Sequence, residues 1–139
     1  MKAIVHTIYG SPEVAKMMEV SKPAPENNEV LVKVYASTVN RTDSGFRSAE
    51  YFVSRMWSGL FRPKHQTLGC EFAGIIEATG EGVTDFNVGD KVFGFNDETF
   101  GGHAEYLTIP KNWAIATMPG NVTFAQAAAI PEGAHYALN

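Results

Sequence analysis

The sequence predicts a mainly β domain with short helices, of the α+β fold class. Short runs rich in β-branched residues recur between residues 2 and 119, and Gly, Pro and Asn separate them. Such runs are typical of strands, and such separators are typical of turns. An alanine-rich, helix-favouring composition appears near the end of the chain, within residues 122–139. The length of 139 residues suits one domain with a hydrophobic core of its own.

The first third of the chain is expected to be antiparallel β structure. Its candidate strands span residues 2–8, 15–20 and 29–38. In the third of them Val30, Val32 and Val34 would share one face, which suits a strand with one buried side.

The middle of the chain is expected to hold a short helix and a long loop. Asn40, Thr42 and Asp43 are residue types that cap a helix N-terminus through a side-chain oxygen, so a helix is expected just after them. Residues 51–66 are rich in aromatic side chains but lack a clear period. We therefore expect an ordered loop there, with apolar anchors, of the kind that often lines a cleft.

The second half continues the β pattern and ends in helices. Candidate strands span residues 72–80, 91–95, 102–110 and 112–119. Between the first two, Val83, Phe86 and Val88 are expected to pack inward. Thr123 is a candidate N-cap for a first helix, and a second helix is expected to begin within residues 131–139.

Composition and charge exclude several classes of function. The formal net charge is −4 and the basic residues are dispersed, so no nucleic-acid partner is expected. No apolar run is long enough to span a bilayer, so no membrane partner is expected either. The single cysteine cannot form an internal disulfide, and the first residues lack the pattern of an export signal. The expected compartment is therefore the cytoplasm.

Four motifs in order carry a family resemblance. They are VNRTD, then LGCEFAGIIEATGEGVTDFNVGDKVFGF, then GGHAEYLTIP, then TFAQAAAIP. Together they resemble the N-terminal catalytic domain of the medium-chain dehydrogenase/reductase superfamily, from about residue 2 to about residue 131. The resemblance implies a GroES-like fold, which is a partly open β-barrel.

The resemblance also implies a domain organisation. Residues 1–139 would form the GroES-like catalytic domain, which faces the substrate, and a dinucleotide-binding domain would follow Asn139. NADPH would be bound mainly by that second domain. The glycines of GFNDETFGGHAEY lack the G-x-G-x-x-G spacing of a phosphate cradle. The chain alone is therefore expected to be inactive, and the longer protein is expected to form a homodimer.

Zinc is not expected, because the resemblance places an unsuitable residue at one of the zinc-ligand positions, so that one ligand is effectively missing. Zinc-dependent relatives carry a cysteine where this chain has Asn40 and a histidine where it has Cys70, and an amide oxygen is a poor substitute for a thiolate. The lobe that holds a structural zinc in those relatives corresponds here to the cysteine-free GFNDETFGGH. A zinc site built from Cys70, Glu71 and either His65 or His103 remains the alternative.

Asparagine at the first ligand position is typical of the zinc-free quinone oxidoreductase and enone reductase branch. The resemblance therefore implies NADPH-dependent reduction of a small-molecule quinone or activated alkene. Asn40 would lie beside the nicotinamide, or only cap the helix. Arg41 would contact the cofactor pyrophosphate, or only be solvated. Thr42 would bond the substrate oxygen, and Tyr51 would donate to a developing enolate, unless both are purely structural.

Cys70 and Glu71 are expected at the edge of the cleft. A reactive thiol would need a nearby cation to lower its pKa, and Arg62, Lys64 and His65 lie just upstream. Buried packing is the preferred interpretation, because free cysteine behaves as a small hydrophobe. Glu71 is interpreted as a structural carboxylate. Two other functions stay open, a zinc-dependent alcohol dehydrogenase with altered ligands and a free-standing GroES-like binding module.

Overall fold

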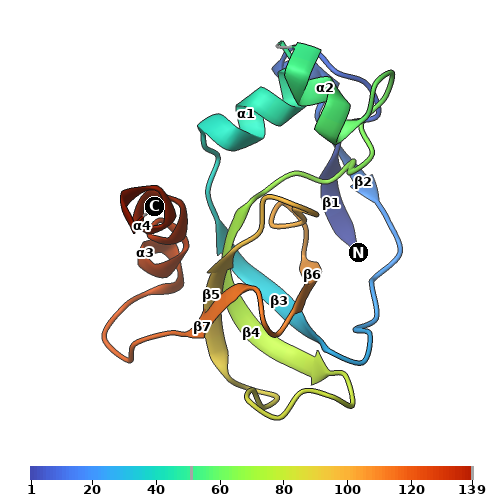
Figure 1. The fold of residues 1–139 in the computed structure, drawn as a ribbon. Coiled ribbons are helices and arrows are strands. Elements are labelled where there is room, and N and C mark those ends of the chain that lie inside the picture. Colours follow the sequence, from blue (N-terminus) through green and yellow to red (C-terminus); the bar gives the residue numbers. More distant parts are fainter. Residues whose placement is uncertain (51, 139) are drawn as a thin grey trace.

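A curled five-stranded antiparallel sheet forms the body of the chain (Figure 1). The structure is a computed structural model, and it describes residues 1–50 and 52–138. The order of the strands is β6-β3-β4-β5-β7. Their bounds are β3 Glu29–Ser37, β4 Glu71–Thr79, β5 Lys91–Phe95, β6 Tyr106–Pro110 and β7 Ala114–Thr117. The fold is mainly β with short helices and a partly open barrel, as expected from the sequence and from the resemblance.

A smaller sheet joins β1 (Lys2–Val5) to β2 (Lys16–Glu19), with the 3-10 helix η1 (Pro12–Val14) between them. Single bridges attach β1 to the rest of the domain, Ala3 to Ala104 and Val5 to Thr67. The three strands expected in the first third of the chain are therefore confirmed.

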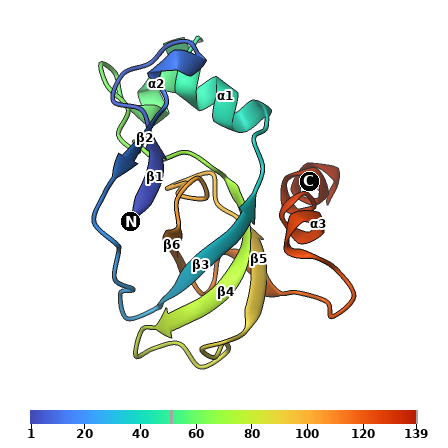
Figure 2. The same ribbon diagram turned by 180° about the vertical axis from the view of Figure 1, so that it is seen from behind.

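Within residues 1–50 and 52–138, four α-helices lie around the main sheet. They are α1 Arg41–Ser48, α2 Phe52–Ser58, α3 Phe124–Ala128 and α4 Pro131–Leu138. Figures 1 and 2 show α1 and α2 beyond one end of the sheet, with α3 and α4 on the opposite side from the β1–β2 ribbon. Thr123 caps α3 as expected, because its hydroxyl accepts from the Gln126 amide at 3.3 Å.

The main core lies inside the curl of the sheet. Its buried members are Val30, Val32, Phe72, Ile76, Val92, Leu107 and Ile109. Val83 and Phe86 pack against it as expected, whereas Val88 is 64% exposed and the expectation for it was wrong. The reason is a tight turn: Asp90 N donates to Asn87 O at 3.1 Å, and this turn directs the Val88 side chain outward.

The expectation of a loop at residues 51–66 was wrong for residues 52–58, which form α2, whereas residues 59–66 form no helix or strand. Tyr51 lies outside the described residues. Val53, Met56 and Trp57 share one face of this helix, at spacings i, i+3 and i+4, and all three are exposed. The helical period was present in the sequence, but its apolar side faces solvent and not the core.

Candidate active site

The N-terminus of α1 is closed by a reciprocal cap between Asn40 and Asp43. Asn40 Oδ1 accepts from Asp43 N at 3.0 Å, and Asp43 Oδ2 accepts from Asn40 N at 3.2 Å. Two of the four amide groups left without helical partners are thereby satisfied. Of the alternatives for Asn40, the capping role is the one seen directly in the geometry.

The other end of the Asn40 amide points to β4. Its Nδ2 donates to Cys70 Sγ at 3.0 Å and to Glu71 Oε2 at 3.3 Å. Because the cap fixes the amide oxygen, the nitrogen is held in this direction. One side chain therefore closes the helix and ties it to Glu71, the first residue of β4, and to Cys70, the residue before it.

Cys70 is fully buried and packs with Phe95, Phe100 and Phe46. Burial raises the pKa of its thiol to about 12, and the Asp43, Glu132 and Glu71 carboxylates act in the same direction. The hydrogen bond from Asn40 opposes this shift but does not reverse it. The cysteine is therefore a neutral thiol at physiological pH, which fits packing and not nucleophilic chemistry. Its place at a cleft edge remains a prediction.

Glu71 joins three elements through one buried carboxylate. Its Oε1 accepts from the backbone N of Glu132 at 2.8 Å, and its Oε2 accepts from the Thr38 hydroxyl and from Asn40 Nδ2. The side chain is 3% exposed, so these donors take the place of water. The contacts tie the start of β4 to the entry of α1 and to the first turn of α4, as a structural carboxylate would.

Thr42 and Arg41 lie side by side at the start of α1 and have different surroundings. The half-buried Thr42 hydroxyl donates to the Glu132 carboxylate, whereas Arg41 is exposed. Their roles toward substrate and cofactor remain predictions, as does that of Tyr51. Sequence reasoning missed Glu132, which lies 90 residues from its partner Thr42. Its only local signal was an acidic residue in a helical first turn.

Asp43 holds the turn before Cys70 in place. Its Oδ1 accepts from Gly69 N at 2.9 Å and from Cys70 N at 3.2 Å, and it is 2% exposed. His103 Nε2 lies 3.7 Å from Asp43 Oδ2 and donates to the carbonyl of Thr38 at 2.6 Å. Gly69 adopts φ +96°, and an added Cβ would lie 2.4 Å from His103 N. Only glycine fits this crossing of two backbones.

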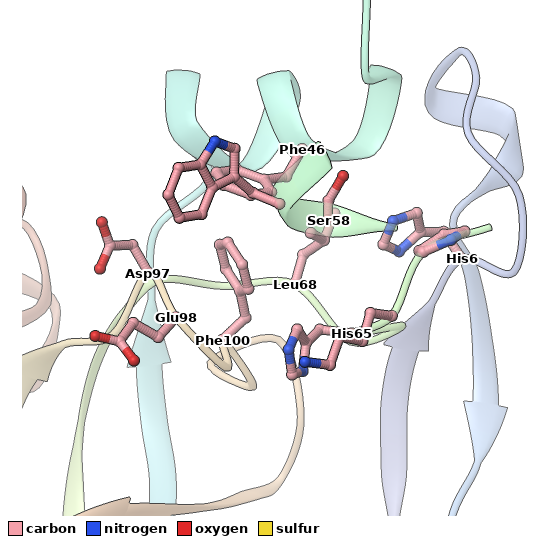
Figure 3. A pocket seen from close by; sticks show the side chains of 11 residues that line it. His6, Phe46, Ser58, His65, Leu68, Asp97, Glu98 and Phe100 are labelled. Atoms are coloured by element: carbon pink, nitrogen blue, oxygen red, sulfur yellow. The ribbon is translucent and has the colours of Figure 1, made fainter. Parts of the chain in front are cut away.

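A cavity of about 540 Å³ lies between α2 and the loop that follows β5 (Figure 3). Phe46 and Phe100, which pack around Cys70, form an edge-to-face pair at 4.8 Å and also line the cavity. Its other lining residues are His6, Trp57, Ser58, Pro63, Lys64, His65, Leu68, Asp97 and Glu98. The lining includes none of Asn40, Thr42, Cys70 or Glu71, so the two phenyl rings separate this space from the polar cluster.

Burial lowers the pKa of His6 and His65, and Lys64 lowers that of His65 further. Both imidazoles are therefore neutral at pH 7. Figure 3 shows Asp97 and Glu98 at one side of the cavity and His65 at the other. The cavity is aromatic in its interior, with two carboxylates on one wall and the Lys64 ammonium among the remaining lining residues.

The donors at the family's zinc positions do not suit a metal. Among residues 1–50 and 52–138, no group of three or more His, Cys, Asp or Glu could hold a metal ion. The Asn40 amide oxygen is already engaged in the cap, and its nitrogen donates to the Cys70 sulfur, which is fully buried among aromatic rings. The alternative of a zinc bound by Cys70, Glu71 and a histidine finds no support in this geometry.

No helix within the described part of the chain is both long enough and apolar enough to cross a bilayer.

Comparison with known proteins finds one matching family and several similar proteins. The profile of the alcohol dehydrogenase GroES-like domain family matches residues 26–132. A quinone oxidoreductase of Lama guanicoe is 39% identical over 131 residues, which cover 94% of this chain and 37% of that protein. The structure of a quinone oxidoreductase from Coxiella burnetii aligns with a TM-score of 0.88 at 31% identity, over 99% of this chain and 43% of that one.

A mycobacterial protein solved in complex with NADPH is also similar. It aligns with a TM-score of 0.79 at 34% identity, over the whole of this chain and 41% of its own. The chain thus spans about two fifths of the length of each of these relatives.

Proposed function

The chain belongs to the alcohol dehydrogenase GroES-like domain family, and from this membership we propose that it is the substrate-side domain of an NADPH-dependent oxidoreductase. The reaction proposed is hydride transfer to a quinone or an activated alkene, without zinc. The similarity to quinone oxidoreductases and to a protein that binds NADPH supports this choice. Since the relatives are more than twice as long, the proposal includes a dinucleotide-binding domain after residue 139.

The observation that carries the zinc-free part is the hydrogen bond between Asn40 Nδ2 and Cys70 Sγ. The two residues occupy the positions that hold zinc in the metal-dependent relatives. Here one is an amide committed to a helix cap, and the other is a buried thiol with a raised pKa. A catalytic zinc takes three protein ligands from Cys, His, Asp or Glu. Asn40 is not in this set, and Cys70, which is, already accepts a hydrogen bond from the Asn40 amide.

NADPH, when bound, supplies the hydride in this proposal. As the hydride adds to an electron-poor carbon of the substrate, the displaced π electrons move to the substrate oxygen, which then takes a proton. A hydrogen-bond donor aimed at that oxygen lowers the barrier. We assign this part to Thr42 and Tyr51. Thr42 now donates to Glu132, so its hydroxyl must change acceptor when the substrate binds.

The remaining assignments concern the cofactor. Arg41, exposed at the first residue of α1, would pair with the pyrophosphate, because a guanidinium is always charged and can bond two oxygens at once. Asn40 would lie beside the nicotinamide ring while still capping α1. Both positions depend on α1, whose N-terminus is fixed by the contacts with Asp43, Cys70 and Glu71.

The test is an activity assay on the natural gene product that contains this chain. Reading its coding sequence past residue 139 comes first, to look for a strand, a glycine-rich turn and a helix. Purified protein is then mixed with NADPH and a panel of quinones and enones, with and without a chelator. We expect NADPH oxidation that chelation leaves unchanged. No oxidation with any acceptor, or stoichiometric zinc whose removal abolishes activity, would disprove the proposal.

A pair of variants tests the part of Thr42 in the same assay. Thr42→Ser keeps a hydroxyl and is expected to keep most of the activity. Thr42→Ala removes it, and a lost oxyanion donor typically costs about 100-fold in kcat. Equal activity of the two variants would show that Thr42 only supports the helix start.

A further inference from the structure

Five large apolar side chains project into solvent from α2 and from the turn after it. The exposed fractions are Val53 65%, Met56 71%, Trp57 80%, Leu60 47% and Phe61 87%. We call these residues the 53–61 patch. Exposed apolar residues are ordinary when scattered, but five within nine residues form a feature that needs a partner.

The underside of α2 fixes the orientation of the patch. Buried Ser58 faces inward, where its Oγ lies 2.9 Å from Tyr9 Oη, and Tyr9 Oη donates to the Gly59 carbonyl at 2.6 Å. On the same side Arg55 Nε donates to Ala49 O at 3.3 Å, with its guanidinium over the Tyr9 ring. The helix therefore cannot roll to bury Val53, Met56 and Trp57 without breaking these contacts.

A tight turn holds the other two members of the patch outward. Lys64 N donates to Ser58 O at 2.7 Å, which closes residues 58–64 into a loop. Gly59 adopts φ +116°, and an added Cβ there would lie 2.2 Å from Arg62 O. The exposure of Leu60 and Phe61 is thus built into the backbone of the turn.

The charge of this segment is opposite to that of the chain. Residues 52–64 contain Arg55, Arg62 and Lys64 and no Asp or Glu, whereas the whole chain has a net charge of −4. Arg62 and Lys64 are exposed beside the apolar side chains. A Trp, Phe and Leu face edged by basic residues is the composition of segments that lie in a membrane interface.

We propose that the 53–61 patch docks on the surface of an anionic lipid bilayer. The apolar side chains enter the boundary between headgroups and acyl chains, and Arg62 and Lys64 lie over anionic headgroups. Composition led to the opposite expectation, that the chain has no membrane partner, and the test below decides between the two. The proposal does not depend on the proposed oxidoreductase activity.

Charge decides between a bilayer and a second copy of the chain. In a two-fold symmetric dimer the same patch meets itself, so the cations of one copy would face those of the other. An anionic surface instead complements Arg62 and Lys64, the two basic side chains exposed beside the patch. Asp97 and Glu98 lie on one wall of the neighbouring cavity (Figure 3), so the bilayer would cover α2 and the turn at 59–64 and not the loop at 96–100.

The test is binding of the full chain to vesicles. Vesicles of phosphatidylcholine with phosphatidylserine are compared with vesicles of phosphatidylcholine alone, by co-sedimentation at low and high NaCl. We expect stronger binding to the anionic vesicles, weakened by salt. Each cation at such a surface contributes about fivefold to the partition coefficient, so Arg62→Gln with Lys64→Gln should lower it about 25-fold.

Matched variants separate the patch from the rest of the surface. Trp57→Ser with Phe61→Ser is expected to abolish sedimentation with vesicles, whereas Met17→Ser with Val88→Ser, which changes two other exposed apolar residues outside the patch, is not. Lys16→Gln with Lys91→Gln is the charge control. Because all these side chains are exposed, the variants should show the wild-type thermal unfolding curve, and that curve is measured for each.

Tryptophan fluorescence reports insertion directly. The emission of the wild-type chain should shift to shorter wavelength when anionic vesicles are added, and Trp57→Phe should remove the shift, because Trp113 packs against the core. Four outcomes would overturn the proposal: no sedimentation with either vesicle, binding that the 57/61 variant retains, no binding by the longer natural gene product because its further domain covers the patch, or a soluble dimer that this variant dissolves. The last would assign the patch to a second copy of the chain.

Discussion

The Asn40 amide nitrogen lies 3.0 Å from the Cys70 sulfur, across 30 residues of sequence, and donates a hydrogen bond to it. The same amide caps α1 through its oxygen, and the sulfur is fully buried among aromatic rings. Two positions that the resemblance aligns with zinc ligands are therefore joined here by a hydrogen bond from an amide to a thiol. The ionisation of the Cys70 thiol and the contribution of Asn40 to stability can each be measured.

Cys70 is expected to resist alkylation while the chain is folded. With a pKa of about 12, roughly one thiol in 10,000 is ionised at pH 8, and the sulfur is also shielded. Modification by iodoacetamide at pH 8 should therefore be slow in buffer and fast in denaturing urea. Mass spectrometry of the labelled chain measures both rates. A native-state rate equal to the denatured one would contradict the structure.

The same shift predicts a loss of stability at high pH. The folded-state pKa of the thiol is raised above the unfolded value, so its contribution is complete below the unfolded pKa near 9 and is lost as pH rises toward 12. One proton changes the free energy of unfolding by at most about 1.4 kcal/mol per pH unit. Urea unfolding at pH 8, 9 and 10 is compared with Cys70→Ala, to subtract other titrating groups. Equal slopes for the two chains would refute the raised pKa.

Asn40 is expected to contribute more to the free energy of unfolding than an ordinary cap residue does. Replacing a cap residue by alanine costs about 1 kcal/mol, and Asn40→Ala also removes a donor to buried Cys70 and Glu71. We expect Asn40→Ser, which keeps the cap oxygen but lacks the amide donor, to remain clearly destabilised. Chemical unfolding measures these losses.

Thr123, the exposed cap of α3, is the matched control for Asn40. Thr123→Ala should cost about as much as an ordinary cap, and Thr123→Ser should cost almost nothing. If Asn40→Ser were as stable as the wild-type chain, the contact with Cys70 would contribute nothing to the folded state.

The Glu71 carboxylate is expected to be hard to replace even by its amide. It accepts from Glu132 N, from the Thr38 hydroxyl and from Asn40 Nδ2, all in a buried site. Glutamine offers one oxygen, so Glu71→Gln leaves at least one donor facing an NH₂ group, at a cost of about 1–3 kcal/mol. Thermal unfolding measures the change. Glu77→Gln, at an exposed pair with Lys22, is the control and should have little effect.

The strands and caps could be predicted because their signals are local. The alternation of Val30, Val32 and Val34 and the position of Thr123 needed no tertiary information. The pairing of Thr42 and Glu71 with Glu132 could not be predicted, because it joins segments about 60 and 90 residues apart. The contacts of Glu132 with Thr42 and Glu71 depend on the tertiary fold, which brings the first turn of α4 to the start of β4.

The 53–61 patch shows a different limit of sequence reasoning. Apolar side chains were expected to anchor a loop, because in most domains they are buried. Residues 53, 56 and 57 do follow a helical period, but the period alone does not say which side of the helix meets the protein. Tyr9, which is distant in sequence, determines which side of α2 faces the protein, because its hydroxyl forms hydrogen bonds with the Ser58 hydroxyl and the Gly59 carbonyl.

Gly69 and Gly89 provide the last prediction, since they share a backbone angle but differ in surroundings. Both adopt φ +96°, yet an added Cβ at Gly69 meets His103 N at 2.4 Å, while at Gly89 nothing lies within 4 Å. Gly89→Ala should therefore cost only the left-handed backbone, about 1 kcal/mol. Gly69→Ala adds a clash between two backbones and disturbs the hydrogen bond from Gly69 N to Asp43, so its loss should be larger by several fold. Urea unfolding of the two variants measures the difference directly. Equal losses would mean that the loop at residues 102–103 yields without cost, and that the close crossing behind Cys70 is not needed for the fold.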